Sequence, residues 1–185
     1  MARRIGKPLD RGIVIAAAFA LLAEGGLSAL SMRRLADRLQ VQAPALYWHF
    51  KGKPELLALM ATEVYAQARA AVRPSQHWRE WLIGYGTVLH DALRSGRDLA
   101  QLCAIARPLE GGSSASATAI AEPLTTLGLE QAAALSAIAS VTSLALGWSM
   151  FEANGPMHSY LEDMIDIDQS FREGLTALTD GLKGP

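Results

Sequence analysis

The sequence predicts an all-α fold, with a small N-terminal helical head and a larger helical body. Of the 185 residues, 50% are apolar, 19% are charged and only 6% are aromatic, a composition typical of helical globular proteins. Apolar residues recur at intervals of three and four along most of the chain, and no useful length alternates apolar and polar residues as a strand would. Glycine and proline punctuate these periodic segments and predict where helices end.

The first two helices are expected on either side of a double glycine. Asp10 suits the N-cap of the first helix, and Gly25 and Gly26 suit a left-handed C-terminal cap. The second helix follows Ser31, and four of its residues form one apolar stripe with i, i+3, i+4 and i+7 spacing: Met32, Leu35, Ala36 and Leu39.

The third helix is expected from Ala43 to about Phe50, after a tight turn at residues 40–42. Leu46 and Phe50 are one turn apart and should face the core. Gly52 ends the helix, and the head is predicted to cover residues 1–53.

The body is predicted to cover residues 54–185. Its helices are expected at about 54–72, 76–94, 98–106, 115–127, 129–152 and 168–182. The breaks between them contain Pro74, Gly96, Pro108, the stretch 111–114, Gly128 and the stretch 154–156.

Charge is distributed unevenly between the two parts. Residues 1–53 hold nine Lys or Arg against three Asp or Glu, a net charge of +6, whereas the remainder carries −7. A basic head on an acidic body is typical of a module that binds a polyanion through the head alone. The single cysteine, Cys103, excludes an intramolecular disulfide and suits a reducing cytoplasm.

The N-terminus resembles a secretory signal, but we predict a soluble protein without a membrane span. Arg3, Arg4, Lys7 and Arg11 precede an apolar run at residues 13–23, yet Asp10 interrupts the basic stretch and no good cleavage site follows. No apolar segment approaches the ~20 residues of a membrane span.

Residues 31–50 have the organisation of a helix-turn-helix, two short helices joined by a sharp turn. Tyr47, Trp48 and His49 are expected on the outer side of the third helix, where their polar tips could contact phosphates and base edges in a major groove. Lys51 and Lys53 follow, placed to meet a phosphate. Two crossing helices also occur in many bundles that do not bind DNA, but the basic charge and the exposed aromatic residues favour DNA binding.

The segments 30–36 (Leu-Ser-Met-Arg-Arg-Leu-Ala) and 45–53 (Ala-Leu-Tyr-Trp-His-Phe-Lys-Gly-Lys) resemble the head of the tetracycline-repressor (TetR) family, most closely its tetracycline-repressor branch. The resemblance implies a three-helix head, a linking fourth helix and a dimerising body. It implies that Lys53 contacts a phosphate and that five residues contact DNA: Arg33, Pro44, Tyr47, Trp48 and His49.

Two residues depart from the pattern of that branch. Ala43 stands where the branch has a base-contacting glutamine, so the operator sequence is expected to differ. Gln40 replaces a turn glycine, and a left-handed conformation there would cost on the order of 1 kcal/mol.

A weaker resemblance continues through the body and implies a homodimer formed by the eighth and last helices. The small-residue run 132–143 suits close helix approach, and Leu175, Leu178 and Leu182 could give the last helix a dimer seam. The same leucines could instead form an intramolecular core. We favour a dimer, because two heads can bind the two half-sites of a palindromic operator.

The resemblance also implies an inducer pocket among the middle helices. The matching positions are Tyr85, Leu89, Cys103, Ala106, Arg107, Pro108, Ile138 and Thr142. Cys103 and Phe151 stand where the branch has metal-coordinating residues, so we predict no metal site and an inducer other than magnesium-tetracycline. Cys103 could equally be an apolar filler, Tyr85 a core aromatic, and Arg107 an ion-pair partner of Asp98 or Glu110.

Two other classes of function make different demands on the sequence. An enzyme would need a recognisable motif around His77, His90, His158 or Cys103, and we find none, so no catalytic residue or cofactor is expected. The second class is a DNA-binding dimer that responds to no ligand and acts as a constitutive repressor or an architectural protein. Unlike a ligand-responsive regulator, it would lack an enclosed apolar cavity of ~300 Å³ or more beside Arg107.

Overall fold

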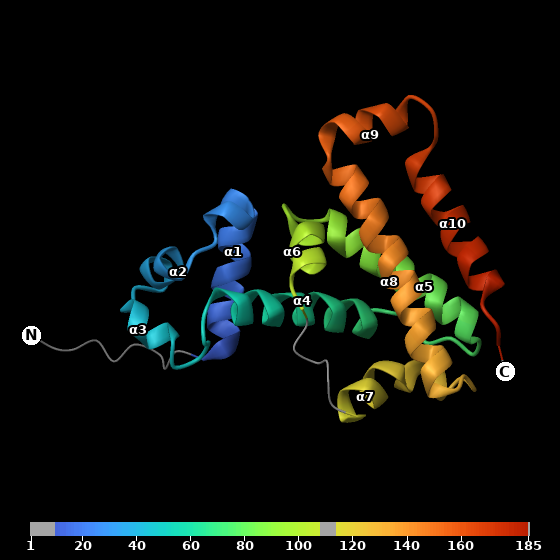
Figure 1. Cartoon of the computed structure of the whole chain (residues 1–185), viewed down its shortest axis with the longest axis horizontal. Helices are drawn as coiled ribbons and strands as arrows, with labels where there is room; N and C mark the ends of the chain where they lie inside the picture. Colours follow the sequence, from blue (N-terminus) through green and yellow to red (C-terminus); the bar gives the residue numbers. More distant parts are fainter. Residues whose placement is uncertain (1–9, 108–113, 185) are drawn as a thin grey trace, which may run out of the picture.

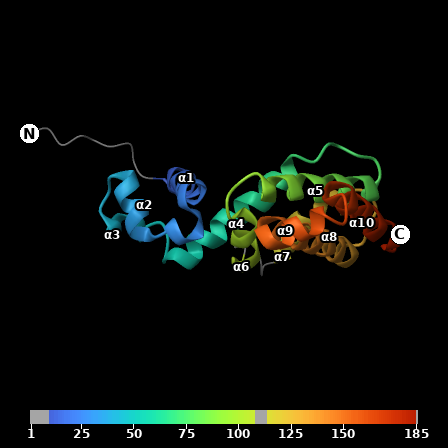
Figure 2. The ribbon, with the colours of Figure 1, turned by 90° about the horizontal axis from the view of Figure 1, so that it is seen from above.

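The computed structural model describes residues 10–107 and 114–184, and every regular element in these ranges is an α-helix, as predicted. The head consists of α1 (Arg11–Ala29), α2 (Met32–Leu39) and α3 (Ala43–Leu46). The body follows with α4 (Lys53–Ala70), α5 (Trp78–Arg94), α6 (Leu99–Ile105), α7 (Ser114–Thr125), α8 (Gln131–Ala153), α9 (Gly155–Glu162) and α10 (Ile167–Gly181). The molecule is elongated, with the head at one end and α10 at the other (Figures 1 and 2).

The first helix begins as the sequence predicts, and its regular geometry breaks at the double glycine. The Asp10 carboxylate accepts a hydrogen bond from the backbone N–H of Ile13 at 2.8 Å, the geometry of an N-cap. Gly26 takes the left-handed conformation, with φ 69°, and α1 then continues for one more turn to Ala29. The positive φ expected at the double glycine is therefore present at Gly26, and the last residues of α1 form a separate helical turn beyond the kink.

The described residues form two hydrophobic cores, and helices α4 and α6 contribute to both. The head core packs α1, α2 and α3 around Leu35, Leu46 and Phe50. The body core is built mainly from α5 and α8, with contributions from α7 and α10. Helix α4 belongs to both, because Leu56 and Met60 lie in the head core whereas its second half lies in the body core.

Helices α5 and α8 form the most extensive helix pair of the body, and Gly86 permits their close approach. A Cβ atom at this position would lie 2.8 Å from Cγ1 of Val141 on α8 and 2.7 Å from Cδ1 of Leu175 on α10. A larger residue would therefore force the Val141 and Leu175 side chains to shift.

The leucines of α10 pack on the body core of their own chain, which favours the intramolecular alternative to a dimer seam. Leu175 is fully buried in the body core, and Leu178 and Leu182 pack against it. Periodicity alone shows that one face of a helix is buried, but not whether the covering surface belongs to the same chain.

Helix α9 was not predicted, because Asn154, Gly155 and Pro156 were interpreted only as a stop. Asn154 ends α8 and also caps α9, with its side-chain oxygen accepting a hydrogen bond from the N–H of Met157 at 3.4 Å. Pro156 falls in the first turn of α9, where its missing N–H costs nothing. None of the residues of α9 is buried, and the helix links the ends of α8 and α10 (Figure 1).

Helices α1 and α8 are long and apolar enough to cross a membrane by length and composition alone. In the structure they instead supply buried residues to the two cores, among them Leu22 of α1 and Val141 of α8. Arg3, Arg4 and Lys7, which suggested a signal sequence, lie outside the described residues.

Candidate DNA-binding surface and ligand pocket

Helices α2 and α3 cross at a sharp turn that fixes the orientation of α3. Ser31 caps α2, its hydroxyl accepting a hydrogen bond from the N–H of Arg34 at 3.2 Å. Gln40 takes the left-handed conformation, with φ 55°, as expected from its place in the turn. The N–H of Val41 then donates to the carbonyl of Ala36 at 3.0 Å and closes the turn. This arrangement is a helix-turn-helix.

Helix α3 is shorter than predicted. It ends at Leu46 rather than near Phe50, and Tyr47, Trp48 and His49 form tighter turns of the i→i+3 type, such as the bond from His49 N–H to the Leu46 carbonyl at 2.9 Å. These aromatic residues are weaker helix formers than alanine or leucine. Leu46 and Phe50 are nevertheless both buried, as predicted, and anchor the segment to the head core.

Most of the predicted DNA-contacting side chains are available on the surface. Trp48 is 89% exposed and Tyr47 55%, although both are large aromatic side chains. Arg33, Pro44 and Lys51 are exposed as well. The presence of these five residues is therefore not explained by a need to fill the chain's own core.

His49 and Lys53 are only half-buried, and each is engaged within the head. The carbonyl of His49 accepts hydrogen bonds from Nε and Nη2 of Arg11, at 3.4 and 3.2 Å. Nζ of Lys53 donates to the carbonyl of Leu27 at 3.4 Å, a long and weak bond. A phosphate role for Lys53 would require its ammonium group to turn away from that carbonyl.

Arg11 and Glu55 hold the segment 49–51 in place, and neither residue was predicted to do so from the sequence. Besides contacting His49, the Arg11 guanidinium lies 5.9 Å above the Phe50 ring and 3.5 Å from the Glu55 carboxylate. Glu55 also accepts a hydrogen bond from the N–H of Lys51 at 2.7 Å. No local pattern signals the contact between Arg11 and His49, because 38 residues separate them.

A bidentate ion pair joins α2 to α1 on the other side of the head. Both terminal nitrogens of Arg38 donate to the Glu24 carboxylate at 2.7 Å. These hydrogen bonds hold the pKa of Glu24 below its ordinary value. Arg38 is therefore engaged within the head, whereas Arg33 has a free guanidinium among the described residues.

The predicted pocket residues do come together in the body, but they are packed. Tyr85 and Leu89 of α5, Cys103 of α6 and Ile138 of α8 are all buried in the body core. Thr142 is half-buried and exchanges a hydrogen bond with the Tyr85 hydroxyl at 3.1 Å.

Tyr85 has the surroundings of a core aromatic residue. Its ring stacks on Trp81 with 5.4 Å between centroids, and burial is the main cause that raises its pKa. Arg107 is exposed at the edge of the described residues, and Pro108 lies outside them. Ala106 packs on the core.

Cys103 is a buried free thiol. Burial raises the pKa of its thiol to about 12, so the thiol is neutral at physiological pH. Its carbonyl accepts a hydrogen bond from the Tyr65 hydroxyl at 3.3 Å. Across the described ranges, no group of three or more His, Cys, Asp or Glu is placed to hold a metal ion.

The hollows in the body lie beside these residues rather than among them. One of about 710 Å³ lies between the α5–α6 turn and the end of α8, and its lining includes Arg97, Ser149 and Glu152. Another of about 610 Å³ lies between α9 and the start of α10, and its lining includes the acidic residues Asp166 and Asp168. Arg94 and His158 border both hollows.

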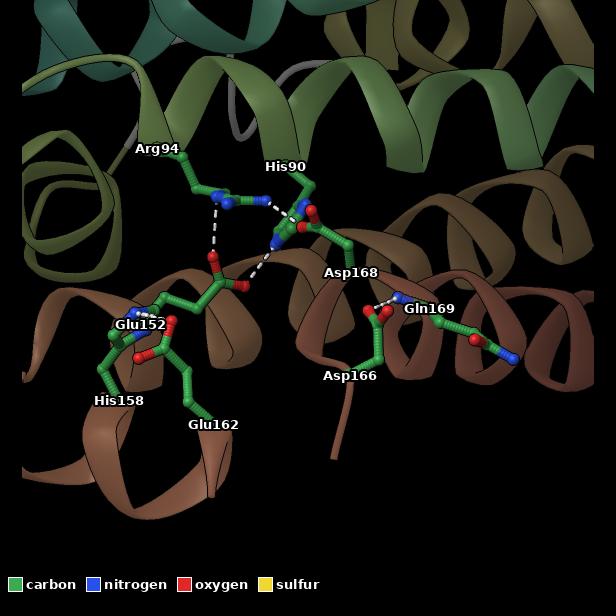
Figure 3. A network of polar contacts seen from close by, with 8 residues as sticks. All are labelled: His90, Arg94, Glu152, His158, Glu162, Asp166, Asp168 and Gln169. Carbon is green, nitrogen blue, oxygen red and sulfur yellow. Dashed lines mark hydrogen bonds and ion pairs between the residues drawn. The ribbon is translucent and has the colours of Figure 1, made fainter. Parts of the chain in front are cut away.

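A polar network joins α5, α8 and α10 beside the two hollows (Figure 3). The buried Glu152 carboxylate meets His90 Nε2 at 2.6 Å and Arg94 Nε at 2.7 Å. Arg94 also pairs with Asp168, which lowers the pKa of that carboxyl. The His90 ring stacks on Phe171 with 3.8 Å between centroids. These contacts tie the ends of three helices together.

The body touches the head directly through the α5–α6 turn. Asp98 takes a left-handed conformation, with φ 57°, and its carboxylate accepts a hydrogen bond from the N–H of Leu27 at 2.8 Å. Leu102 of α6 is fully buried in the head core. We call the bond between Asp98 and Leu27 the head–body contact.

These features define a class of protein, a regulator with a helix-turn-helix head joined to a helical body. The family model described as "Bacterial regulatory proteins, tetR family" matches residues 14–60. The tetracycline repressor protein class A from transposon 1721 of Escherichia coli is 33% identical over 198 residues, covering 94% of this chain and 90% of that protein. The chain belongs to the TetR family, and as such it is a DNA-binding transcriptional regulator and not an enzyme.

Solved structures agree with this assignment over the whole fold. A TetR variant from Acinetobacter baumannii AYE, in complex with minocycline, superimposes with a TM-score of 0.76 at 34% identity, covering 94% of this chain and 96% of that one. BioQ bound to its double-stranded DNA operator superimposes with a TM-score of 0.68 at 31% identity, covering 94% and 98%. The predicted fold class and family are thereby confirmed.

Proposed function

We propose that this chain is a homodimeric repressor that occupies a palindromic operator in the cytoplasm and is released by a small molecule other than magnesium-tetracycline. The observation that carries the proposal is the head–body contact. Because Asp98, the N-cap of α6, and Leu102, in the middle of α6, both contact the head, a displacement of α6 changes the contacts that orient the head. A coupling free energy of 1–3 kcal/mol between inducer binding and operator binding would change operator affinity by about 5- to 150-fold.

The nature of the inducer follows from the residues at the predicted pocket. A neutral, buried Cys103 and an exposed Phe151 replace the metal-coordinating residues that the family resemblance implies, so a metal–drug chelate has no protein ligand there. The remaining lining, Leu89, Ile138 and the Tyr85–Thr142 pair, favours an apolar or weakly acidic molecule of medium size. Such a molecule would have to displace packed side chains to enter.

The dimer interface is expected on the outward face of α8. Its exposed residues form a row of small side chains that would let a second helix approach closely: Ala132, Ser136, Ala139, Ser143 and Gly147. The exposed Met150 and Phe151 extend this face at the end of the helix. The leucine seam of α10 is already used inside the chain, so α10 would contribute its polar face instead.

The packing of the pocket residues also favours a second candidate function, a ligand-independent DNA-binding dimer. In that case the core around Tyr85 and Cys103 is only structural, and the head–body contact fixes the head permanently. The two candidates differ in whether any small molecule lowers operator affinity.

The test is fluorescence anisotropy of the purified protein with the DNA that flanks its gene, across a salt series and then against a panel of apolar and weakly acidic compounds. We expect saturable binding that resists competitor DNA and a compound that releases it. Tyr47→Ala should reduce specific binding by about 5- to 150-fold without changing the oligomeric state. Specific binding that no compound weakens would support the ligand-independent dimer, and weak binding to all sequences would contradict both.

A further inference from the structure

Gln42 stands at the start of the recognition helix with a free side chain. It is the N-cap residue of α3, and its carbonyl accepts a hydrogen bond from the N–H of Ala45 at 2.8 Å. Its side chain forms no capping bond and is exposed to solvent. Glutamine is not among the residues favoured at N-caps, so helix capping does not explain its presence.

The neighbouring residues fix the direction of the Gln42 side chain. Val41 and Ala43 both pack against the head core, whereas Gln42 and Pro44 are exposed. The turn before Gln42 is held by the bond between Val41 and Ala36, and α3 begins directly after it. The Gln42 side chain is therefore presented from a fixed backbone position rather than from a mobile loop.

Gln42 also carries the hydrogen-bonding groups that the rest of the helix start lacks. The next four residues, 43–46, are Ala, Pro, Ala and Leu, and none of their side chains can donate or accept a hydrogen bond. In helix-turn-helix proteins the N-terminal residues of the recognition helix contact base edges. A glutamine amide can donate its N–H to adenine N7 while its carbonyl oxygen accepts from adenine N6–H, a bidentate pairing that matches adenine among the four bases.

We propose that Gln42 recognises one adenine in each half-site of the operator through its side-chain amide. The carbonyl oxygen accepts from adenine N6–H, and the amide N–H donates to adenine N7. This assignment rests on the proposed function, in which the head binds an operator. Gln42 would then supply the polar contact through which the start of α3 selects a base, whereas Ala43 and Pro44 supply only apolar contacts.

The experiment selects binding sites from random double-stranded DNA with the full-length protein and then repeats the selection with variants. The wild-type consensus should contain a symmetric pair of adenines that Gln42→Ala no longer selects, and the variant should lose about 5- to 150-fold in affinity for the wild-type site. Gln42→Glu should instead prefer cytosine at that position, because a carboxylate accepts a hydrogen bond from cytosine N4.

Gln40→Ala is the matched control, because it removes another exposed glutamine of the same turn outside the helix start. It should retain the wild-type consensus. Thermal unfolding of both variants at position 42 should match the wild type, since the Gln42 side chain has no intramolecular partner among the described residues. A wild-type consensus that Gln42→Ala leaves unchanged overturns this assignment alone, whereas a wild-type protein that selects no sequence overturns the proposed function with it.

Discussion

At the scale of single residues, the turn of the helix-turn-helix contains local backbone strain. Gln40 has φ 55°, a conformation that costs a non-glycine residue on the order of 1 kcal/mol. Gln40→Gly should therefore raise the free energy of unfolding by about 1 kcal/mol, measured by urea denaturation.

The matched control for this prediction is Gln42→Gly, two residues further along. Gln42 has φ −74°, which any residue adopts readily, so glycine there should lower stability slightly. Equal effects of the two substitutions would show that the left-handed turn is not strained.

Cys103 gives a prediction with a defined pH dependence. The folded-state pKa of about 12 lies above the ordinary value of 9.0, so the thiol stays neutral in the folded protein where an unfolded chain would already ionise. Stability from this group is constant below pH 9 and falls as the pH rises from 9 toward 12.

Alkylation by iodoacetamide measures the same property. The native thiol should react far more slowly than a free cysteine at pH 8, and denaturant should abolish the difference. Rapid labelling of the native protein would mean that Cys103 is open to solvent and belongs to a real cavity.

The capping, burial and exposure of single residues were the features of the head that the sequence predicted best. The capping roles of Asp10 and Ser31, the buried pair Leu46 and Phe50, and the exposure of Tyr47 and Trp48 all depend on spacing within one or two helical turns. The contact between Arg11 and His49 has no such local signal.

At the scale of helices, the head–body contact predicts a specific mutational effect. Asp98→Ala removes the acceptor for the Leu27 N–H, and loss of one such hydrogen bond to a charged group costs about 1.5–3 kcal/mol. We expect the variant to unfold at a lower urea concentration and to show a weaker effect of any inducer on operator affinity.

Asp98→Asn is the control for this substitution. Asparagine tolerates the left-handed conformation at φ 57° and keeps a side-chain oxygen that can accept the same bond. It should restore most of the stability and of the inducer effect. If Asp98→Ala retained both in full, α6 would not control the head through this contact.

Most helix boundaries of the body were predictable, α9 excepted, but the partners of each helix were not. The predicted range 168–182 agrees closely with α10, yet its leucines face the chain's own core rather than a second chain. Whether Tyr85 and Cys103 line a cavity or fill a core depends on packed volume, which no local pattern encodes. The predicted end near residue 154 was correct, but the same residues also start α9.

At the scale of the whole molecule, the exposed row of small residues on α8 predicts a homodimer. Light scattering coupled to size-exclusion chromatography should give twice the 19.8 kDa of one chain. Ser143→Arg should convert the protein to a folded monomer, because an arginine in the centre of the row prevents close helix approach.

Ala70→Arg is the matched control, since Ala70 is also exposed but is the last residue of α4 and does not belong to the row on α8. It should leave the dimer intact. A dimer that tolerates Ser143→Arg would place the interface on a different surface.

The shared helix α4 has a consequence for how such regulators can be recombined. Cutting the chain between residues 53 and 54 would remove Leu56 and Met60 from the head core and expose the surfaces that they cover. A head joined to a foreign body would therefore have to bring the first half of α4 with it, and also find a leucine to replace Leu102. Chimaeras that pair one operator with another inducer should therefore be joined within α4, after its head-core residues and before its body-core residues. A junction at the apparent border of the helix-turn-helix would disrupt the head core.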